Sequence, residues 1–201
     1  MFPNSKQQFF DRWAATYDWL VPSVFYQAIH QRLLEYVHKS DRLQVLDISC
    51  GTGQLLDRLA SQFPDLEGTG IDFSTEMINQ ATKRDRYPSR LTYLQGNAEA
   101  LPFPDAAFDA IFNTISFLHY ANPELVFAEV QRVLRSGGYF YLVDFTTRWA
   151  RAPQTLGTSP QTSIRLYSPT AREQLGQQAK LTAISHHYLL GPVLLTIFQR
   201  C

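Results

Sequence analysis

The chain has few of the features that mark secreted, metal-binding or membrane-spanning proteins. Its 201 residues include only two cysteines, Cys50 and Cys201, and no spacing typical of a metal site, so we expect neither a disulfide framework nor a bound metal. No apolar run approaches the roughly 20 residues of a transmembrane helix, and the N-terminus has no apolar run of signal-peptide length. We therefore expect a cytoplasmic protein with no stable membrane insertion.

An excess of charge of one sign is also missing. Lys+Arg and Asp+Glu both number 18, so the formal net charge is zero. A general nucleic-acid binder needs a basic surface to neutralise phosphates, and we expect no nucleic-acid partner. With 45% hydrophobic residues and no internal repeat or linker-like tract, the chain has the composition of a globular protein of ordinary domain size.

From residue 44 onward, short runs rich in β-forming residues alternate with helical stretches. The clearest helix is expected over residues 122–138, with Asn122 as its cap, Pro123 in its first turn and Gly137-Gly138 at its end. Another is expected over residues 22–39. Alternation of this kind predicts a parallel sheet with helices on both faces. The expected strands are residues 44–48, 66–72, 91–97, 108–115 and 138–145.

The end of the chain departs from that alternation. A helix over residues 168–180, capped by Ser168, is followed by strands at 181–190 and 193–200. Only Gly191-Pro192 separates these strands, and so short a connection forces them to pair antiparallel. The predicted fold is therefore α/β: a Rossmann-like three-layer sandwich around a seven-stranded, mostly parallel sheet with one antiparallel strand.

The stretch VLDISCGTGQLLDRL, residues 45–59, indicates a strand, a glycine-rich turn and the start of a helix. A phosphate-binding P-loop needs a lysine after its last glycine, and Gln54 stands there instead. A dinucleotide loop would have its third glycine at Leu56 and would place Asp47 near a pyrophosphate, where like charges repel. Asp47 suits a cation better. S-adenosylmethionine carries an ammonium and a sulfonium and no phosphate.

A second acid supports this interpretation. Asp72 ends the second expected strand, where a carboxylate can accept both ribose hydroxyls of an adenosine. Ser74 can then begin the next helix and bring Phe73 and Met77 to a nucleoside face. Asn97, at the end of the third expected strand, can pair with the adenine edge. All these positions lie at carboxyl ends of strands, where open α/β sheets bind ligands.

Five segments resemble, in order and spacing, the successive motifs of class I S-adenosylmethionine-dependent methyltransferases: VLDISCGTG, GIDFSTEMI, QGNAEALPFPDAAFD, FNTISFLHY and EVQRVLRSGGYFYLVDF. The likeness is greatest to the small-molecule branch that includes the ubiquinone/menaquinone-biosynthesis type, and it covers residues 40 to 200. It implies S-adenosyl-L-methionine as the cofactor. The implied contacts are Asp47, Ser49, Cys50, Gly51 and Gly53 at the methionine moiety, Asp72 at the ribose, Asn97 and Ala98 at the adenine, and Asn113 to Ser116 on the methionine side.

Two positions depart from the family pattern. Ser49 stands where glycine is usual, and Asn97 stands where aspartate is usual. Glycine serves where the backbone needs an unusual angle or a close ligand approach, and serine is its smallest polar substitute. The amide of Asn97 still offers a carbonyl to an adenine amino group. We expect weakened rather than abolished binding.

Aromatic residues crowd the N-terminus before the first helix. Phe9, Phe10, Trp13, Tyr17 and Trp19 predict a flap over the cofactor, with Tyr17 as the contact, although ordinary core packing is the alternative. His119 is the candidate general base, followed by Tyr17 and Tyr120, and its alternative role is a hydrogen-bonded loop residue. Cys50 is expected to be a small buried residue rather than a nucleophile.

The predicted function is transfer of a methyl group to a small-molecule acceptor by in-line displacement, by a monomer or homodimer. We expect one domain over residues 1–201: an N-terminal lid and helix (1–40), a cofactor-binding core (41–145) and an acceptor-side segment with the C-terminal strand pair (146–201). Arg148, Trp149, Arg151 and Arg165 in that segment favour a polar or acidic group on a planar or apolar body. The alternatives are a module that binds the cofactor without turnover and a nicotinamide oxidoreductase, which Leu56 and Asp47 disfavour.

Overall fold

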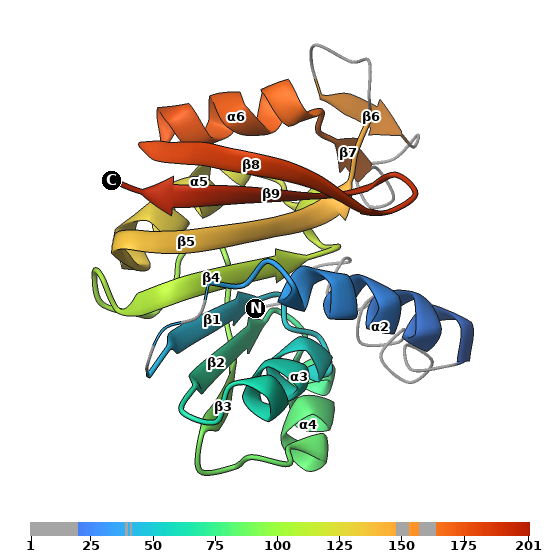
Figure 1. Cartoon of the computed structure of the whole chain (residues 1–201), viewed down its shortest axis with the longest axis vertical. Coiled ribbons are helices and arrows are strands. Elements are labelled where there is room, and N and C mark those ends of the chain that lie inside the picture. The colour runs from blue at the N-terminus through green and yellow to red at the C-terminus, as the bar shows by residue number, and fades with distance from the viewer. Residues whose placement is uncertain (1–19, 39, 41, 148–152, 157–163) are drawn as a thin grey trace, which may run out of the picture. The chain divides into compact units, whose positions relative to one another are not determined.

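The computed structural model describes residues 20–38, 40, 42–147, 153–156 and 164–201, which fall into two compact units, residues 1–97 and 98–201 (Figure 1). The N-terminal aromatic flap, Tyr17 included, lies outside the described residues. So do three residues of the predicted acceptor segment, Arg148, Trp149 and Arg151. The single-domain boundaries stay a prediction.

The first unit is built around three parallel strands in the order β3-β2-β1. Pairing runs from Gln44↔Glu67 to Ile48↔Ile71 and from Gly68↔Leu91 to Asp72↔Gln95, so the strands end side by side. Helices α3 and α4 are both drawn in front of them in Figure 1. In chain order the elements are α2 (Leu20–Leu34), β1 (Gln44–Ile48), α3 (Gln54–Gln62), β2 (Glu67–Asp72), α4 (Thr75–Arg84) and β3 (Leu91–Gln95).

The second unit has four strands in the order β4-β5-β9-β8. β4 and β5 are parallel, and β9 runs antiparallel to both of its neighbours, β5 and β8. Register shifts interrupt the edge strand β8 between Ala183 and Ser185 and again between Tyr188 and Leu190. The elements are β4 (Phe108–Thr114), the 3-10 turn η1 (Phe117–His119), α5 (Pro123–Val133), β5 (Leu134–Phe145), β6 (Gln154–Leu156), β7 (Ile164–Leu166), α6 (Pro169–Gln178), β8 (Leu181–Leu190) and β9 (Val193–Arg200).

Aromatic side chains form the core of the second unit. Phe127 on α5 packs edge-on against Phe140 of β5 and Phe198 of β9, with ring centroids 5.6 and 5.3 Å apart. A Cβ on Gly176 of α6 would lie 2.5 Å from Phe198. Helices α5 and α6 therefore pack on the same face of the sheet, and α6 comes so close that its contact position must be glycine.

The predicted start of the helix over residues 122–138 is right and its end is wrong. Pro123 opens the helix, and Val126, Val130 and Val133 form its buried stripe. The helix ends at Val133, because the buried Leu134 takes an extended conformation and begins β5. Asn122 does not cap the helix with its side chain, since Nδ2 donates to Glu99 instead.

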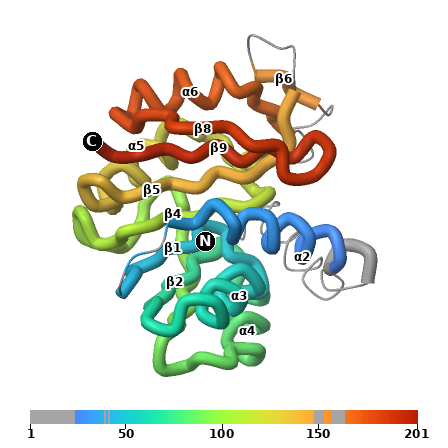
Figure 2. Tube along the Cα trace, in the orientation of Figure 1, coloured from blue at the N-terminus to red at the C-terminus, as the bar shows by residue number. Residues whose placement is uncertain are grey.

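Other boundaries also shift. The helix predicted over residues 22–39 is α2, which ends at Leu34. The strand predicted over 91–97 ends at Gln95. Strands 44–48, 181–190 and 193–200 are confirmed as predicted, and Figure 2 shows β8 and β9 turning back on each other around Gly191-Pro192. Ser168 caps α6, with its hydroxyl accepting from the Ala171 N–H at 3.2 Å.

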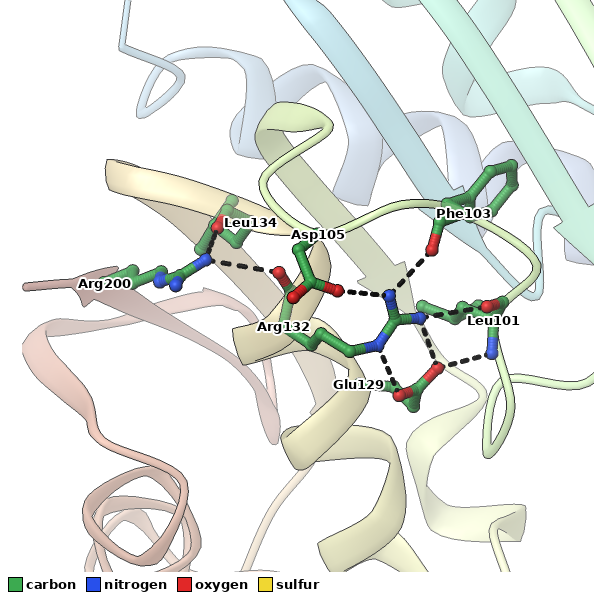
Figure 3. Close-up of polar contacts among 7 residues, drawn as sticks. All are labelled: Leu101, Phe103, Asp105, Glu129, Arg132, Leu134 and Arg200. Carbon is green, nitrogen blue, oxygen red and sulfur yellow. Dashed lines mark hydrogen bonds and ion pairs between the residues drawn. The ribbon is translucent and has the colours of Figure 1, made fainter.

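One arginine ties the loop of residues 101–106 to α5. The guanidinium of Arg132 donates to the carbonyls of Leu101 and Phe103 at 3.0 and 2.7 Å, and it pairs with Asp105 and Glu129 (Figure 3). Glu129 in turn accepts the Leu101 N–H at 2.7 Å. The loop is thus held by charge-assisted bonds rather than by a strand ladder.

The predicted fold class is confirmed. Three parallel strands in one unit, and four with β9 reversed in the other, make a seven-stranded, mostly parallel α/β protein. The small antiparallel pair of strands β6 and β7 within residues 146–167 was not predicted. None of the helices in the described part of the chain is long and apolar enough to cross a membrane.

Candidate functional site

Asp47 lies at the end of β1 as a buried acid. Its side chain is 1% exposed, and its Oδ1 has no hydrogen-bond partner among the described residues. Burial raises the pKa of the Asp47 carboxyl well above its usual range, and the charge of Asp72 raises it further. A buried carboxylate oxygen without a donor is costly, so this position suits a ligand that brings a cation or N–H groups.

The loop after β1 runs through three left-handed residues. Ser49, Gly51 and Gly53 have φ values of 57°, 54° and 77°. The Cys50 N–H donates to the Ile71 carbonyl at 3.1 Å, and the Gly53 N–H donates to the Cys50 carbonyl at 3.0 Å. Gly53 begins α3 without a side-chain cap. Because the residue at the N-cap of α3 is a glycine, it has no side chain to cap the helix, and a helix N-terminus favours a carboxylate or another anionic group.

Asp72 connects this loop to the end of β2. Its Oδ2 accepts the Gly51 N–H and its Oδ1 accepts the Ser74 N–H, both at 2.9 Å. Each carboxylate oxygen can accept a further bond, so ribose hydroxyls can still bind there. Asp72 therefore holds the loop after β1 and the start of α4 to the end of β2, and it is also a candidate ligand contact.

The remaining candidates of the first unit lie close to Asp72. Ser74 caps α4 as predicted, accepting the Met77 N–H at 3.2 Å. Phe73 is 40% exposed, whereas Met77 is only 3% exposed, so Phe73 is the better placed to meet a nucleoside. The Gly96 N–H donates to the Asp72 carbonyl at 2.9 Å, which brings the exposed Asn97 next to the same strand end.

Tyr93 is a residue of this site that the sequence did not single out. A Cβ on Gly53 would lie 2.8 Å from its hydroxyl, and a Cβ on Gly70 would lie 2.7 Å from its Cδ1. Burial raises the pKa of the Tyr93 phenol, so it stays neutral. Its ring supports the glycine loop. No local pattern signals this, because the contact joins β3 to the turn after β1.

Cys50 is buried, as predicted. Burial raises the pKa of its thiol, and the carboxylates of Asp47 and Asp72 raise it further. A thiol that remains protonated is a weak nucleophile. Cys50 therefore contributes its backbone to the loop rather than reactive sulfur.

A cavity of about 420 Å³ opens between α3 and α4. Among the described residues that are predicted to bind the cofactor, Gly53 lines it, whereas Asp47 and Asp72 do not. Arg86 and Asp57, which also line it, pair with each other. Its lining is Thr52, Gly53, Gln54, Asp57, Ala81, Arg84, Asp85, Arg86 and Tyr93.

The second unit has its own polar cluster after β4. The amide nitrogen of the fully buried Asn113 donates to the Ser116 hydroxyl at 2.8 Å and to the Tyr120 hydroxyl at 2.7 Å. His119 ends the η1 turn and is partly exposed. These predicted residues come together within their unit. Ala98, the other cofactor candidate of this unit, is buried.

A comparison with protein families matches residues 46–142 to a methyltransferase domain. This match covers 97 of the chain's 201 residues, and over that segment the chain is similar to the methyltransferase-domain family. The matched residues contain Asp47, the glycine loop, Asp72, Asn97 and the Asn113 cluster, so the predicted family resemblance is confirmed over the segment that carries these candidates. The roles of the individual residues stay predictions.

Named relatives share this domain. The chain is 39% identical over 114 residues to a fatty-acid O-methyltransferase of Mycolicibacterium smegmatis, covering 54% of this chain and 41% of that protein. It is 35% identical over 103 residues to a demethylmenaquinone methyltransferase of Thermus thermophilus, covering 51% and 47%. The chain thus spans less than half the length of these two relatives.

The fold is shared with solved methyltransferase structures. A SAM-dependent methyltransferase from Aquifex aeolicus superposes with a TM-score of 0.68 at 20% identity, over 85% of this chain and 88% of that one. At this level of identity the likeness shows the fold.

Proposed function

We propose that this protein is an S-adenosylmethionine-dependent methyltransferase that acts on a small-molecule acceptor. The observation that carries the proposal is the buried Asp47 carboxyl, whose Oδ1 has no donor among the described residues and which lies at the start of a left-handed glycine loop. The family match of residues 46–142 supports it.

The residues present fit this cofactor. The Oδ1 of Asp47 would accept a hydrogen bond from the ammonium of the amino-acid part of S-adenosylmethionine, and the N-terminus of α3 would bind the carboxylate of that part. Asp72 would accept ribose hydroxyls, and Asn97 and Ala98 would border the adenine. When bound, S-adenosylmethionine supplies a methyl group on a sulfonium that is already a good leaving group. The chain therefore has to provide mainly alignment and a dry site.

The acceptor side is proposed to lie in the second unit. The Tyr120 hydroxyl, which accepts from Asn113, is a candidate contact for an acceptor oxygen. His119 is the candidate base for an acceptor that must lose a proton during attack. The β7 segment adjoins this turn, since Tyr167 packs on Phe117 with ring centroids 5.0 Å apart.

Two relatives are named for fatty-acid and demethylmenaquinone methylation, so long-chain acids and quinols head the list of acceptors to test. The cytoplasmic location, the monomeric or homodimeric state and the lack of a nucleic-acid partner remain proposals from composition.

Calorimetry on the purified protein tests the cofactor. We expect S-adenosylmethionine and S-adenosylhomocysteine to bind and NAD not to bind. Asp47→Asn keeps the shape of the side chain and removes its charge. It should weaken the binding of S-adenosylmethionine at least tenfold, which is about 1.4 kcal/mol. Asp65→Asn, a change at an exposed acid of the same unit, is the matched control. Binding of NAD alone would refute the proposal.

Labelled-methyl transfer to quinols, phenols, long-chain acids and amines then tests turnover. Transfer to any acceptor supports the enzyme. Tight cofactor binding with no transfer across the panel would favour the non-catalytic binding module.

A further inference from the structure

The turn after β4 is held in a strained conformation. Ile115 has a φ of 49°, a left-handed value that a β-branched residue adopts at considerable cost. Its N–H donates to the Val143 carbonyl at 2.8 Å. Strain of this kind persists only where the surroundings over-determine the backbone.

Two side chains, one on β4 and one on β5, hold the backbone of this turn in place. Asn113, near the end of β4, donates to Ser116 and Tyr120. Asp144, near the end of β5, is 1% exposed, and its Oδ2 accepts the Leu118 N–H at 2.9 Å. The Asp144 Oδ1 accepts the Phe145 N–H at 2.7 Å. The carboxylate therefore fastens the η1 turn directly to the sheet.

The charge of Asp144 has a buried counterpart. Arg172 of α6 is fully buried and donates to the carbonyls of Asp144 and Leu194 at 3.0 and 2.9 Å. Burial lowers the pKa of Arg172 to about 10, so it is still a cation at neutral pH. Burial raises the pKa of Asp144 to about 6, and the charge of Arg172 limits that rise.

We propose that Asp144 is a positioning residue whose carboxylate holds the Ile115–Tyr120 turn in its strained form and thereby directs Ser116 and His119. The proposal rests on the proposed function, in which this turn carries the candidate base His119 on the acceptor side. When Asp144 takes up a proton, its hydrogen bonds to the backbone weaken and the strained turn loosens. Methyl transfer should therefore slow as the pH falls through about 6.

Several other groups around the turn can titrate or carry charge. Arg172 faces Asp144 from α6, and Tyr188 of β8 acts on Arg172. His119 lies on the turn itself. Tyr167 packs on Phe117 from the other side, and Arg165 of β7 acts on Tyr167. A pH effect must therefore be assigned to Asp144 by substitution.

The first test follows the amide protons of Leu118 and Phe145 by NMR while the pH is changed. In the natural protein both should shift with a common midpoint near 6, because both donate to the same carboxylate. Asp144→Asn should abolish the shift. If neither amide titrates in the natural protein, the proposal is wrong, and this result requires no variant to fold.

The second test measures the rate of methyl transfer at pH 5.5 and pH 8, with an acceptor that the labelled-methyl screen identifies. We expect Asp144→Asn to slow transfer about tenfold at pH 8, which corresponds to the loss of about one charge-assisted hydrogen bond, and to remove the part of the pH dependence centred near 6. Glu129→Gln is the matched control, because Glu129 also accepts a loop N–H, that of Leu101, but does not touch the turn.

An unchanged rate of transfer in Asp144→Asn, or an equal loss in Glu129→Gln, would overturn the positioning role. If the natural protein binds no S-adenosylmethionine while the Leu118 amide still titrates, the proposed function fails and the hold of Asp144 on the turn stands.

Discussion

Ser49 adopts a backbone conformation that costs a side chain about 1–2 kcal/mol and costs glycine almost nothing. Ser49→Gly should therefore leave the free energy of unfolding unchanged or raise it by up to about 1 kcal/mol, because relieved strain outweighs the added freedom of the unfolded chain. Ser49→Val should lower it by about 1–2 kcal/mol. Urea denaturation of the natural protein and of the two variants measures the order of their unfolding free energies. A less stable glycine variant would show that the serine hydroxyl supports the loop.

Asp72 is expected to serve the fold and the ligand together. A strand-end acid in an open cleft is expected to matter little for stability, but here it accepts two backbone N–H groups. Hydrogen bonds to a charged group contribute about 1.5–3 kcal/mol each, and water can replace part of these contacts, so Asp72→Ala should lower the free energy of unfolding by about 2–4 kcal/mol. The same substitution should also weaken the binding of S-adenosylmethionine.

Phe73→Ala provides the comparison for Asp72. Phe73 is 40% exposed, so its loss should change stability by less than about 1 kcal/mol while removing any nucleoside contact. Thermal melting of the free proteins and calorimetry on the same samples separate the two effects. An Asp72→Ala protein that is as stable as the natural one would contradict the fastening role.

For single residues, the sequence identifies the acids at strand ends but does not show which groups they contact. Asp47 and Asp72 could be singled out because each follows an apolar run and precedes a turn. Asp144 has the same signal in YLVDF, but its importance depends on Leu118, 26 residues earlier. The contact of Tyr93 with Gly53 joins residues that are even further apart, 40 positions along the chain, and it depends on strand register.

The packing of α6 on the sheet depends on a glycine inside the helix. By helix propensity alone, Gly176→Ala should stabilise the protein by about 1 kcal/mol. A Cβ there would lie 2.5 Å from the Phe198 ring, and forcing atoms into a packed core costs about 1–3 kcal/mol. We expect a net loss of stability.

The double variant Gly176→Ala with Phe198→Leu tests the cause. The penalty of the alanine should shrink in the leucine background, and a double-mutant cycle of unfolding free energies measures the coupling. A stabilising Gly176→Ala would mean that α6 can move outward freely.

Periodicity predicts which elements exist better than where they end. The stripe of Val126, Val130 and Val133 identifies α5, yet Leu134 continues the apolar pattern while the backbone has already become extended. Gly137-Gly138 suggested the helix end, but both glycines lie in β5, where a Cβ on Gly138 would meet the Asp109 carbonyl at 2.8 Å. Tertiary pairing decides the boundary.

Acid should destabilise the whole protein through His30. This buried histidine accepts from Arg58 through Nδ1, and burial together with the Arg58 charge lowers its pKa to about 3. Between pH 3 and its ordinary value of 6.5 the unfolded chain binds the extra proton, so the free energy of unfolding falls as the pH drops below 6.5. At pH 5 this amounts to about 2 kcal/mol.

Urea denaturation of the natural protein and His30→Gln at pH 7 and pH 5 isolates this group. Asp144 acts in the opposite direction: its raised pKa makes the folded chain bind the proton between about pH 4 and pH 6. Asp144 is present in both proteins, so subtracting the pH-dependent change in unfolding free energy of His30→Gln from that of the natural protein removes the contribution of Asp144. If both lose equal stability on acidification, His30 is not responsible.

The interrupted pairing of β8 bears on how copies of the chain behave when they are crowded. An edge strand offers unpaired backbone groups to any other strand, and Ile184 and Tyr188 add exposed apolar surface to this one. The two register shifts in β8 fall at Ile184 and at Leu189, next to Tyr188, so an incoming strand finds no long straight row of groups to match. The same irregularities that disturb the ladder within the fold thereby guard against fibrous aggregation.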